Sequence, residues 1–241
     1  RSFEEMTNIS RAFRRKLEES ARITWLEPAE VHSSEDGTKK YRFILPDGEA
    51  IESVLLPERD HFTLCLSSQV GCAQACAFCL TARGGWVRNL TRSEILSQVM
   101  EVERDLADPE KLTNIVVMGM GEPLDNYDNM VSALKTLMDG DFGLKYSSRR
   151  VTLSTAGVVP NMARLGREVP VNLAVSLNAT DNETRNRLMP INRKYPLEDL
   201  LEACRTFPLP PRRRVTFEYI LMEGVNDAPA QAEALAALLK P

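Results

Sequence analysis

Residues 64–85 read LCLSSQVGCAQACAFCLTARGG, and this stretch holds four of the five cysteines in a chain of 241 residues. Cys72, Cys76 and Cys79 have the spacing C-x3-C-x2-C, and Cys65 lies upstream of them. Three thiolates on a short loop can bind one metal centre and leave a coordination position open, as in a 4Fe-4S cluster held by three cysteines. The alternative is a zinc ion with Cys65 as its fourth ligand. A zinc deaminase is disfavoured, because the H-x-E and P-C-x-x-C elements are absent.

The composition fits one large domain, with 43% hydrophobic residues. An odd number of cysteines in a chain of this length favours metal or redox chemistry over disulfides. The sequence has no apolar run of the roughly 18 residues that cross a bilayer and no signal-peptide pattern at its start, so we expect a cytoplasmic protein. The net charge of −4 argues against a general nucleic-acid coat protein, although the arginines at 149–150 and 212–214 could form a local basic patch.

The order of expected elements indicates an α/β fold. The first twenty residues suit a surface helix, and YRFILPDGEAIESVLLP at 41–57 is typical of a β-hairpin. Thr91 and Glu94 form a capping-box pattern that predicts a helix to about residue 106. Five strands are expected to alternate with helices, the strands lying within 61–68, 114–123, 149–157, 172–179 and 213–223.

Alternation along these strands predicts one apolar face and one face that is small or polar. In the first strand Leu64 and Leu66 oppose Cys65 and Ser67, and three later strands repeat the split. A closed barrel fills its interior with branched aliphatic side chains, so a polar inner face indicates an open cavity able to hold a polar cofactor. An antiparallel sheet with one solvated face is the alternative, but the intervening helices favour parallel strands. Cys65 then points into the cavity, apart from the cysteine loop, which disfavours the zinc arrangement.

C-x3-C-x2-C after the first strand of such a fold resembles the radical S-adenosylmethionine (SAM) superfamily. Together with VVMGMGEPL, RRVTLSTAGVVP and SLNA, the stretch LCLSSQVGCAQACAFC resembles the RlmN/Cfr family of RNA adenine C2/C8 methyltransferases, the RlmN branch more closely. The resemblance implies a partial (β/α) radical SAM barrel with five of about six βα units. It also implies that the chain is incomplete at both ends. The expected parts are the tail of an N-terminal helical domain at 1–25, a β-hairpin extension at 26–60 and the barrel core at 61–241.

The resemblance also implies the cofactors and their ligands. Cys72, Cys76 and Cys79 would hold a 4Fe-4S cluster whose free iron binds SAM, and an electron from the cluster would split the sulfonium to give a 5′-deoxyadenosyl radical. The motif Gly119-Met120-Gly121-Glu122-Pro123 follows the second strand. It is not a dinucleotide fingerprint, because Leu124 stands where the third glycine would be. The SAM-contacting positions implied by the family are Gly121, Glu122, Ser154, Ser176, Leu177 and Asn178.

Two further residues match catalytic positions of the family. Glu52 aligns with the general base that removes the C2 proton, and Cys65 with the cysteine that resolves a protein–RNA crosslink by forming a disulfide with a methyl-carrying cysteine. That carrier and a sixth strand have no counterpart here, and Cys204 is expected to be core packing, so the piece itself need not be active. The implied substrate is an adenosine of large-subunit ribosomal RNA and of some transfer RNAs. The implied partners are that RNA and an electron donor such as flavodoxin, and we expect a monomer.

Two alternatives remain open. The chain could be another radical SAM enzyme that performs sulfur insertion or enzyme activation, although Cys65 and GMGEPL argue against this. It could also be a non-catalytic, zinc-bound RNA-binding domain.

Overall fold

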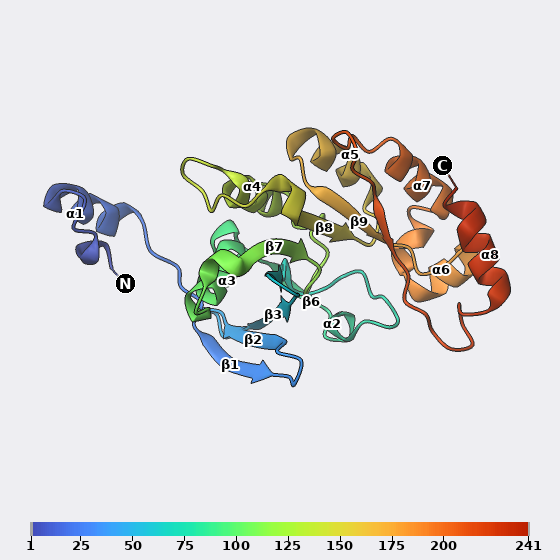
Figure 1. Cartoon of the computed structure of the whole chain (residues 1–241), viewed down its shortest axis with the longest axis horizontal. Coiled ribbons are helices and arrows are strands. Elements are labelled where there is room, and N and C mark those ends of the chain that lie inside the picture. The colour runs from blue at the N-terminus through green and yellow to red at the C-terminus, as the bar shows by residue number, and fades with distance from the viewer. Residues whose placement is uncertain (1, 241) are drawn as a thin grey trace.

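The computed structural model describes residues 2–240, and one eight-stranded sheet forms its centre (Figure 1). The order in the sheet is β1-β2-β3-β4-β7-β8-β9-β10, and the last five strands run parallel. These strands are β1 Pro28–Ser33, β2 Lys39–Ile44, β3 Ala50–Pro57, β4 Phe62–Cys65, β7 Leu112–Val117, β8 Val151–Thr155, β9 Asn172–Ser176 and β10 Thr216–Glu218. Five parallel strands joined through helices confirm the expected α/β fold. Arg1 and Pro241, which bound the expected segments, lie outside the described residues.

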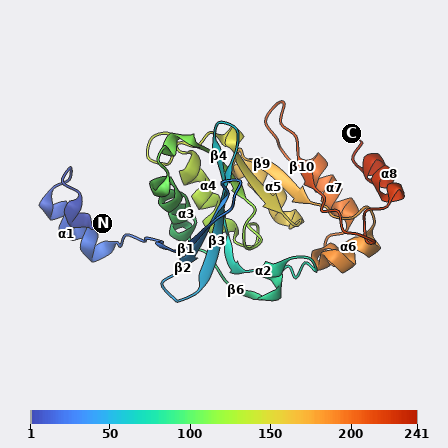
Figure 2. The ribbon, with the colours of Figure 1, turned by 60° about the horizontal axis from the view of Figure 1, so that its bottom comes forward.

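Helices α3, α4, α5 and α7 lie against one another in that order along one face of the sheet (Figures 1 and 2). The α-helices are α1 Arg11–Ser20, α2 Leu80–Arg83, α3 Arg92–Asp105, α4 Tyr127–Met138, α5 Val159–Glu168, α6 Asn182–Leu188, α7 Leu197–Arg205 and α8 Pro229–Leu238. Short 3-10 turns are η1 Phe3–Glu5, η2 Pro109–Lys111, η3 Ser148–Arg150 and η4 Pro190–Arg193. A separate small hairpin pairs β5 Gln69–Gly71 with β6 Trp86–Asn89 around the cysteine loop. The capping box of Thr91 and Glu94 is present at the start of α3, as expected.

The extension before the barrel has three strands and not the two of the expected hairpin. β1 pairs with β2, β2 with β3, and β3 joins the barrel by antiparallel pairing with β4. Every residue of β1 is exposed. A strand without a buried face does not need apolar residues at every second position, so its sequence gives no strand signal.

The fifth barrel strand is shorter than the expected 213–223. Beyond β10 the backbone N–H of Ile220 donates to Asn178 Oδ1 at 2.8 Å, and that of Met222 donates to Asn226 Oδ1 at 2.7 Å. Asparagine side chains thus take the place of a strand neighbour for these backbone donors.

The hydrogen-bond register confirms the two-faced sheet. Leu64, Ile115 and Val151 lie side by side in β4, β7 and β8, and each is fully buried on the face that the helices cover. On the other face Ser176 lies beside Glu218. Apolar side chains therefore bind the helices to the sheet, which leaves the polar face free for a cavity.

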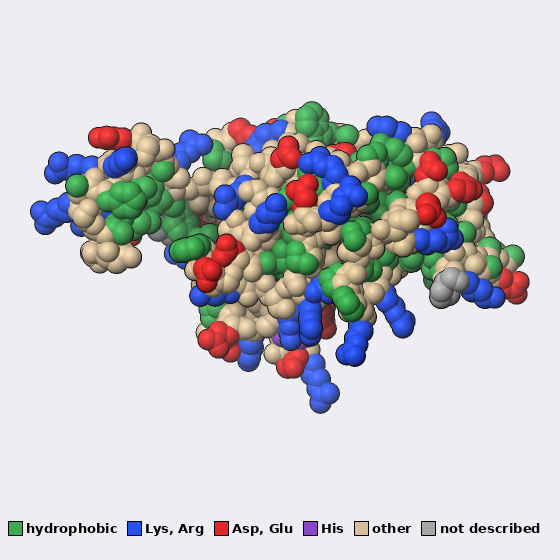
Figure 3. Space-filling model, turned by 90° about the horizontal axis from the view of Figure 1, so that it is seen from above, with side chains coloured by type: hydrophobic (Ala, Val, Ile, Leu, Met, Phe, Trp, Pro, Cys, Tyr) green, Lys and Arg blue, Asp and Glu red, His purple; other side chains and the backbone are tan. Residues whose placement is uncertain are grey.

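Helix α1 lies apart from this body, at the end of an extended segment (Figures 1 and 2). Its Ser10 cap accepts a hydrogen bond from the N–H of Phe13, but none of its residues is buried. In Figure 3, hydrophobic and basic side chains cover much of the projecting part of the chain that contains α1. The segment rejoins the body where Ser97 donates to the carbonyl of Thr24 and Leu26 enters the core.

Across residues 2–240, we find no helix with the length and apolarity that a bilayer crossing requires.

Candidate cofactor site

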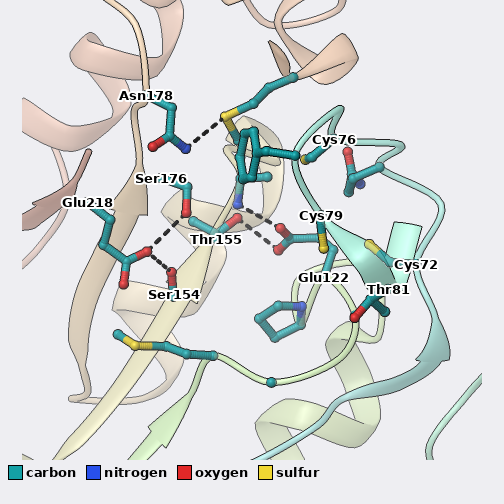
Figure 4. A pocket seen from close by; sticks show the side chains of 18 of the residues that line it. Cys72, Cys76, Cys79, Thr81, Glu122, Ser154, Thr155, Ser176, Asn178 and Glu218 are labelled. Atoms are coloured by element: carbon teal, nitrogen blue, oxygen red, sulfur yellow. Dashed lines mark hydrogen bonds between the residues drawn. The ribbon is translucent and has the colours of Figure 1, made fainter. Parts of the chain in front are cut away.

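A cavity of about 500 Å³ opens at the carboxyl ends of β7, β8, β9 and β10. Ligands of parallel α/β sheets bind at this end, and the volume is in the range of small-molecule and cofactor sites. The cysteine loop forms one wall of the cavity and the strand ends form the other (Figure 4).

The loop brings Cys72, Cys76 and Cys79 to the same wall. The β5–β6 hairpin anchors its start, where the N–H of Cys72 donates to the Gly85 carbonyl at 2.8 Å. Helix α6 anchors its middle, where the N–H of Ala77 donates to the carbonyl of Leu188 at 2.9 Å (Figure 2). These two hydrogen bonds fix the loop so that its three thiols face the cavity.

These thiols suit a metal centre. Burial raises the pKa of Cys72 to about 11 and that of Cys76 to about 12, so both need a cation to become thiolates at neutral pH. Within residues 2–240 no three His, Cys, Asp or Glu side chains, the clustered cysteines included, are close enough to hold a single metal ion. Three thiols along one wall of an open cavity match the donor set of a cluster that keeps one iron free for a ligand.

Glu122 lies in the wall between the cysteines and the strands and is 3% exposed (Figure 4). Its carboxylate accepts hydrogen bonds from the backbone N–H of Leu124 at 3.0 Å, the hydroxyl of Thr155 at 2.8 Å and the N–H of Ala156 at 2.7 Å. Burial raises the pKa of Glu122 to about 7, although these donors favour the ionised form. An ammonium group in the cavity would favour the carboxylate further.

Glu218 projects from β10 towards the same cavity. One of its carboxylate oxygens accepts from the hydroxyl of Ser154 at 2.8 Å and from that of Ser176 at 3.0 Å (Figure 4). Ser154 and Ser176, which the family resemblance implied, therefore both donate to Glu218, which the resemblance did not include.

Asn178 also lines the cavity, in a left-handed conformation with φ of 58°. Asparagine tolerates this conformation better than most residues. Its amide N–H donates to Met189 Sδ at 3.4 Å, and its oxygen accepts from Ile220 as described. Leu177 is fully buried, and its side chain is not among those that line the cavity.

Cys65 and Glu52 are absent from the cavity lining but lie on its side of the sheet. Cys65 pairs with Val54, and the side chain two residues before Val54 on the same face of β3 is Glu52. Burial and, to a smaller extent, the nearby Glu218 raise the pKa of Cys65 to about 11, although a backbone hydrogen bond at Met118 acts to lower it. Glu52 forms an exposed ion pair with Lys40 at 3.0 Å.

The charge of the cavity favours a cationic ligand. Glu122 and Glu218 line it, and the lining found among the described residues contains no lysine or arginine. SAM carries an ammonium and a sulfonium group, and carboxylates can pair with or lie beside both.

Sequence reasoning did not select Glu218 and Thr155 as site residues. Glu218 lay on the predicted polar face, and this alternation was the only local signal for it. Thr155 has no such signal, because it is the strand's last residue and reaches Glu122 only through the fold.

Comparison with known proteins agrees with this geometry. The radical SAM superfamily matches residues 66–236. Proteins named dual-specificity RNA methyltransferase RlmN match nearly the whole chain. They include those of Desulfosudis oleivorans, 63% identical over 99% of this chain and 64% of that protein, and of Syntrophobacter fumaroxidans, 54% identical over 99% and 70%. The chain belongs to the RlmN family of the radical SAM superfamily. A radical SAM methyltransferase of Sphaerobacter thermophilus has the same fold, with a TM-score of 0.92 and 43% identity over 99% of this chain and 71% of that one.

RlmN-family membership implies a 4Fe-4S cluster and SAM as cofactors. The chain spans 64% and 65% of the length of the RlmN relatives from Desulfosudis oleivorans and Geobacter sulfurreducens.

Proposed function

We propose that this chain is the catalytic core of a radical SAM methyltransferase that modifies C2 of an adenosine in RNA. The substrates we infer are large-subunit ribosomal RNA and transfer RNA, in line with the dual specificity in the names of the relatives. The observation that carries the proposal is that three thiols and two carboxylates line one cavity. We further propose a cytoplasmic monomer that receives electrons from a flavodoxin-type donor.

In this proposal Cys72, Cys76 and Cys79 hold the 4Fe-4S cluster. The cluster and SAM together supply one-electron cleavage of the sulfonium, which is cofactor chemistry and not that of the side chains. Glu122 would accept hydrogen bonds from the ammonium group of SAM, and the strand ends with Ser154, Ser176 and Asn178 would border the cofactor. Gly121 lets the loop before Glu122 approach Ser68 and Gln69 closely, and Leu177 completes the set of proposed SAM-contacting positions.

Glu52 and Cys65 act on the RNA side of the site. Glu52 removes the C2 proton, and Cys65 forms a disulfide with a methyl-carrying cysteine to release the methylated RNA. None of the five cysteines of this chain is assigned the carrier role. Cys204 is 8% exposed on α7, outside the cavity lining.

Iron analysis after anaerobic reconstitution tests the cluster assignment. We expect about four irons per chain with visible absorbance, lost when Cys72, Cys76 or Cys79 is replaced by Ala. Cys65→Ala and Cys204→Ala are matched controls that should keep the cluster. Zinc without visible absorbance would contradict the proposal, and loss of iron in Cys65→Ala would contradict the choice of ligands.

Calorimetry with SAM tests the cofactor pocket. Glu122→Ala should weaken SAM binding to the reconstituted protein by about 1–3 kcal/mol, because a charged hydrogen-bond partner is lost. Glu49→Ala, which removes a half-buried carboxyl in the β2–β3 turn outside the cavity lining, is the control. Urea unfolding of both variants separates lost binding from lost folding, and unchanged SAM affinity would remove Glu122 from the site.

Methyl transfer tests the substrate. The chain is extended with the remaining third of the Desulfosudis oleivorans relative and incubated with labelled SAM, a reductant and RNA. Digestion to nucleosides should yield 2-methyladenosine. A product labelled at another base, or sulfur insertion, would favour a different radical SAM reaction.

A further inference from the structure

Arg185 in α6 is the largest of the fully buried side chains described, with 0% exposure. Its guanidinium donates to the carbonyls of Leu177 at 3.0 Å, Ala156 at 2.8 Å and Ser176 at 3.0 Å, and to Asn192 Oδ1 at 3.0 Å. All four acceptors are neutral, and none of the ion pairs found within residues 2–240 includes Arg185. A buried cation without a counter-charge is costly to folding.

Burial lowers the pKa of Arg185 to about 10, so the side chain is still positively charged at neutral pH. Neutral carbonyls can orient the guanidinium, but they do not cancel its charge. The energetic cost therefore suggests a negative group elsewhere in the native holoprotein.

The position of α6 indicates which group this is. The helix lies directly on the cysteine loop, where Ala77 donates to Leu188. The thiolate forms of two cysteines would raise the pKa of Arg185, namely Cys76 on that loop and Cys204 on α7. Burial raises the pKa of Cys204 to about 12, which keeps it neutral. Cys76 instead becomes a thiolate once it binds iron.

We propose that Arg185 is the fixed counter-charge of the iron–sulfur site and raises its reduction potential. This inference rests on the proposed function, because it requires Cys72, Cys76 and Cys79 to hold the cluster. One-electron reduction adds a negative charge to the cluster, and a fixed cation in a low-dielectric interior stabilises the reduced state more than the oxidised state. Arg185 is a positioning residue, since it does not line the cavity and acts through charge.

The same guanidinium also fixes the strand ends that border the SAM site, because Ala156 follows β8 and Ser176 ends β9. Charge and hydrogen bonding can be separated by substitution. Arg185→Gln removes the charge, whereas Arg185→Lys keeps the charge and loses most of the hydrogen bonds. Arg187→Gln removes the same charge from an exposed position of the same helix and is the matched control.

The experiment is a potentiometric titration of the reconstituted chain with dithionite and mediator dyes, followed by electron paramagnetic resonance. We expect Arg185→Gln to shift the one-electron reduction equilibrium at least tenfold towards the oxidised cluster, a lowering of about 59 mV. Arg185→Lys should stay within a third of that shift, and Arg187→Gln should match the parent. An unchanged potential in Arg185→Gln, or an equal fall in Arg185→Lys, would overturn the inference.

A second variant covers the case in which Arg185→Gln does not fold. Asn192→Asp places a carboxylate against the guanidinium and neutralises its charge while Arg185 stays in place. The amide of Asn186, which now accepts from Asn192, can flip to donate to the new carboxylate, whereas the N–H of Leu197 and the carboxylate of Glu198 hold the amide of Asn182 as it is. The potential should again fall, and an unchanged potential would contradict the inference.

The wild-type titration separates the two proposals. A wild-type chain that takes up no cluster overturns the proposed function and this inference with it. A wild-type chain with a normal cluster and variants with unchanged potentials overturns only the role of Arg185.

Discussion

At Gly121 the site depends on the absence of a side chain. The residue has φ of 101°, and a Cβ built there would lie 2.6 Å from Cβ of Gln69 and 2.7 Å from the hydroxyl oxygen of Ser68. Glycine is therefore required both for its conformation and for the close approach of the loop to the segment after β4.

Gly121→Ala should destabilise the protein more than a positive φ alone explains. Gly48 has φ of 87° with nothing within 4 Å of the added Cβ, so Gly48→Ala measures the conformational cost, about 1–2 kcal/mol. The clash at Gly121 should add about 1–3 kcal/mol. Urea unfolding of both variants checks this, and equal losses would show that the loop moves aside freely.

At the scale of elements, α3 begins with a reinforced cap. The Glu94 carboxylate accepts hydrogen bonds from the backbone N–H of Thr91 at 2.8 Å and from both terminal nitrogens of Arg88 at 2.9 and 3.0 Å. Burial acts to raise the pKa of Glu94, but the hydrogen bonds from Arg88 and Thr91 outweigh it and lower this pKa below its ordinary value of 4.5. The cap thereby ties the start of α3 to β6, the strand that closes the cysteine loop.

This cap should make stability depend on pH on the acid side. Because the folded pKa of Glu94 is lowered, its stabilisation is complete above about pH 5 and is lost as the pH falls below 4.5. Glu94→Gln should reduce the free energy of unfolding by about 2 kcal/mol at pH 7 and by much less at pH 3.

Urea unfolding between pH 3 and pH 7 measures the difference. Glu110→Gln, an exposed carboxyl in η2, is the control and should follow the parent at every pH. A constant difference across this range would mean that the charge of Glu94 does not stabilise the cap.

At the scale of the whole molecule, the two ends of the parallel sheet differ in charge. The cavity with its carboxylates lies at the carboxyl ends of the strands. The arginines at 149–150 and 212–214 precede β8 and β10 and so lie at the amino ends, where Arg213 donates to the carbonyls of Ser148 and Pro170. The clusters that the sequence suggested as a basic patch do come together, but at the opposite end from the cavity.

Glu52 and Cys65 belong to the cavity side of this arrangement, and their proposed roles predict different failures. In the protein extended as above, Cys65→Ala should accumulate a covalent protein–RNA adduct, because release requires attack by this thiol. Glu52→Ala should stall the same intermediate earlier, at proton removal. Denaturing gels with labelled RNA detect the adduct.

Cys204→Ala is the matched control for this experiment and should turn over like its parent, because Cys204 is buried on α7 away from the cavity. Normal turnover by Cys65→Ala would refute its role in release.

The sequence by itself determined the features that depend on near neighbours. The spacing of Cys72, Cys76 and Cys79, the capping box of α3 and the alternation along each strand arise within a few residues, so they could be interpreted without the fold. They gave the α/β class, the position of the cavity and one of its walls. Strand β1 escaped prediction, because it lacks any buried face.

Only the tertiary structure decided which distant side chains meet. Glu218 is one of 34 acidic residues, and only the alternation of its strand distinguishes it locally. The parallel pairing of β10 with β9 and of β9 with β8 brings it to Ser154, 64 positions earlier in the chain. Arg185 similarly reads as one more arginine on a polar helix, yet the packing of α6 between the strand ends and the cysteine loop buries it completely. Charge burial depends on the elements that surround a residue, and that environment is set by contacts far apart in the sequence.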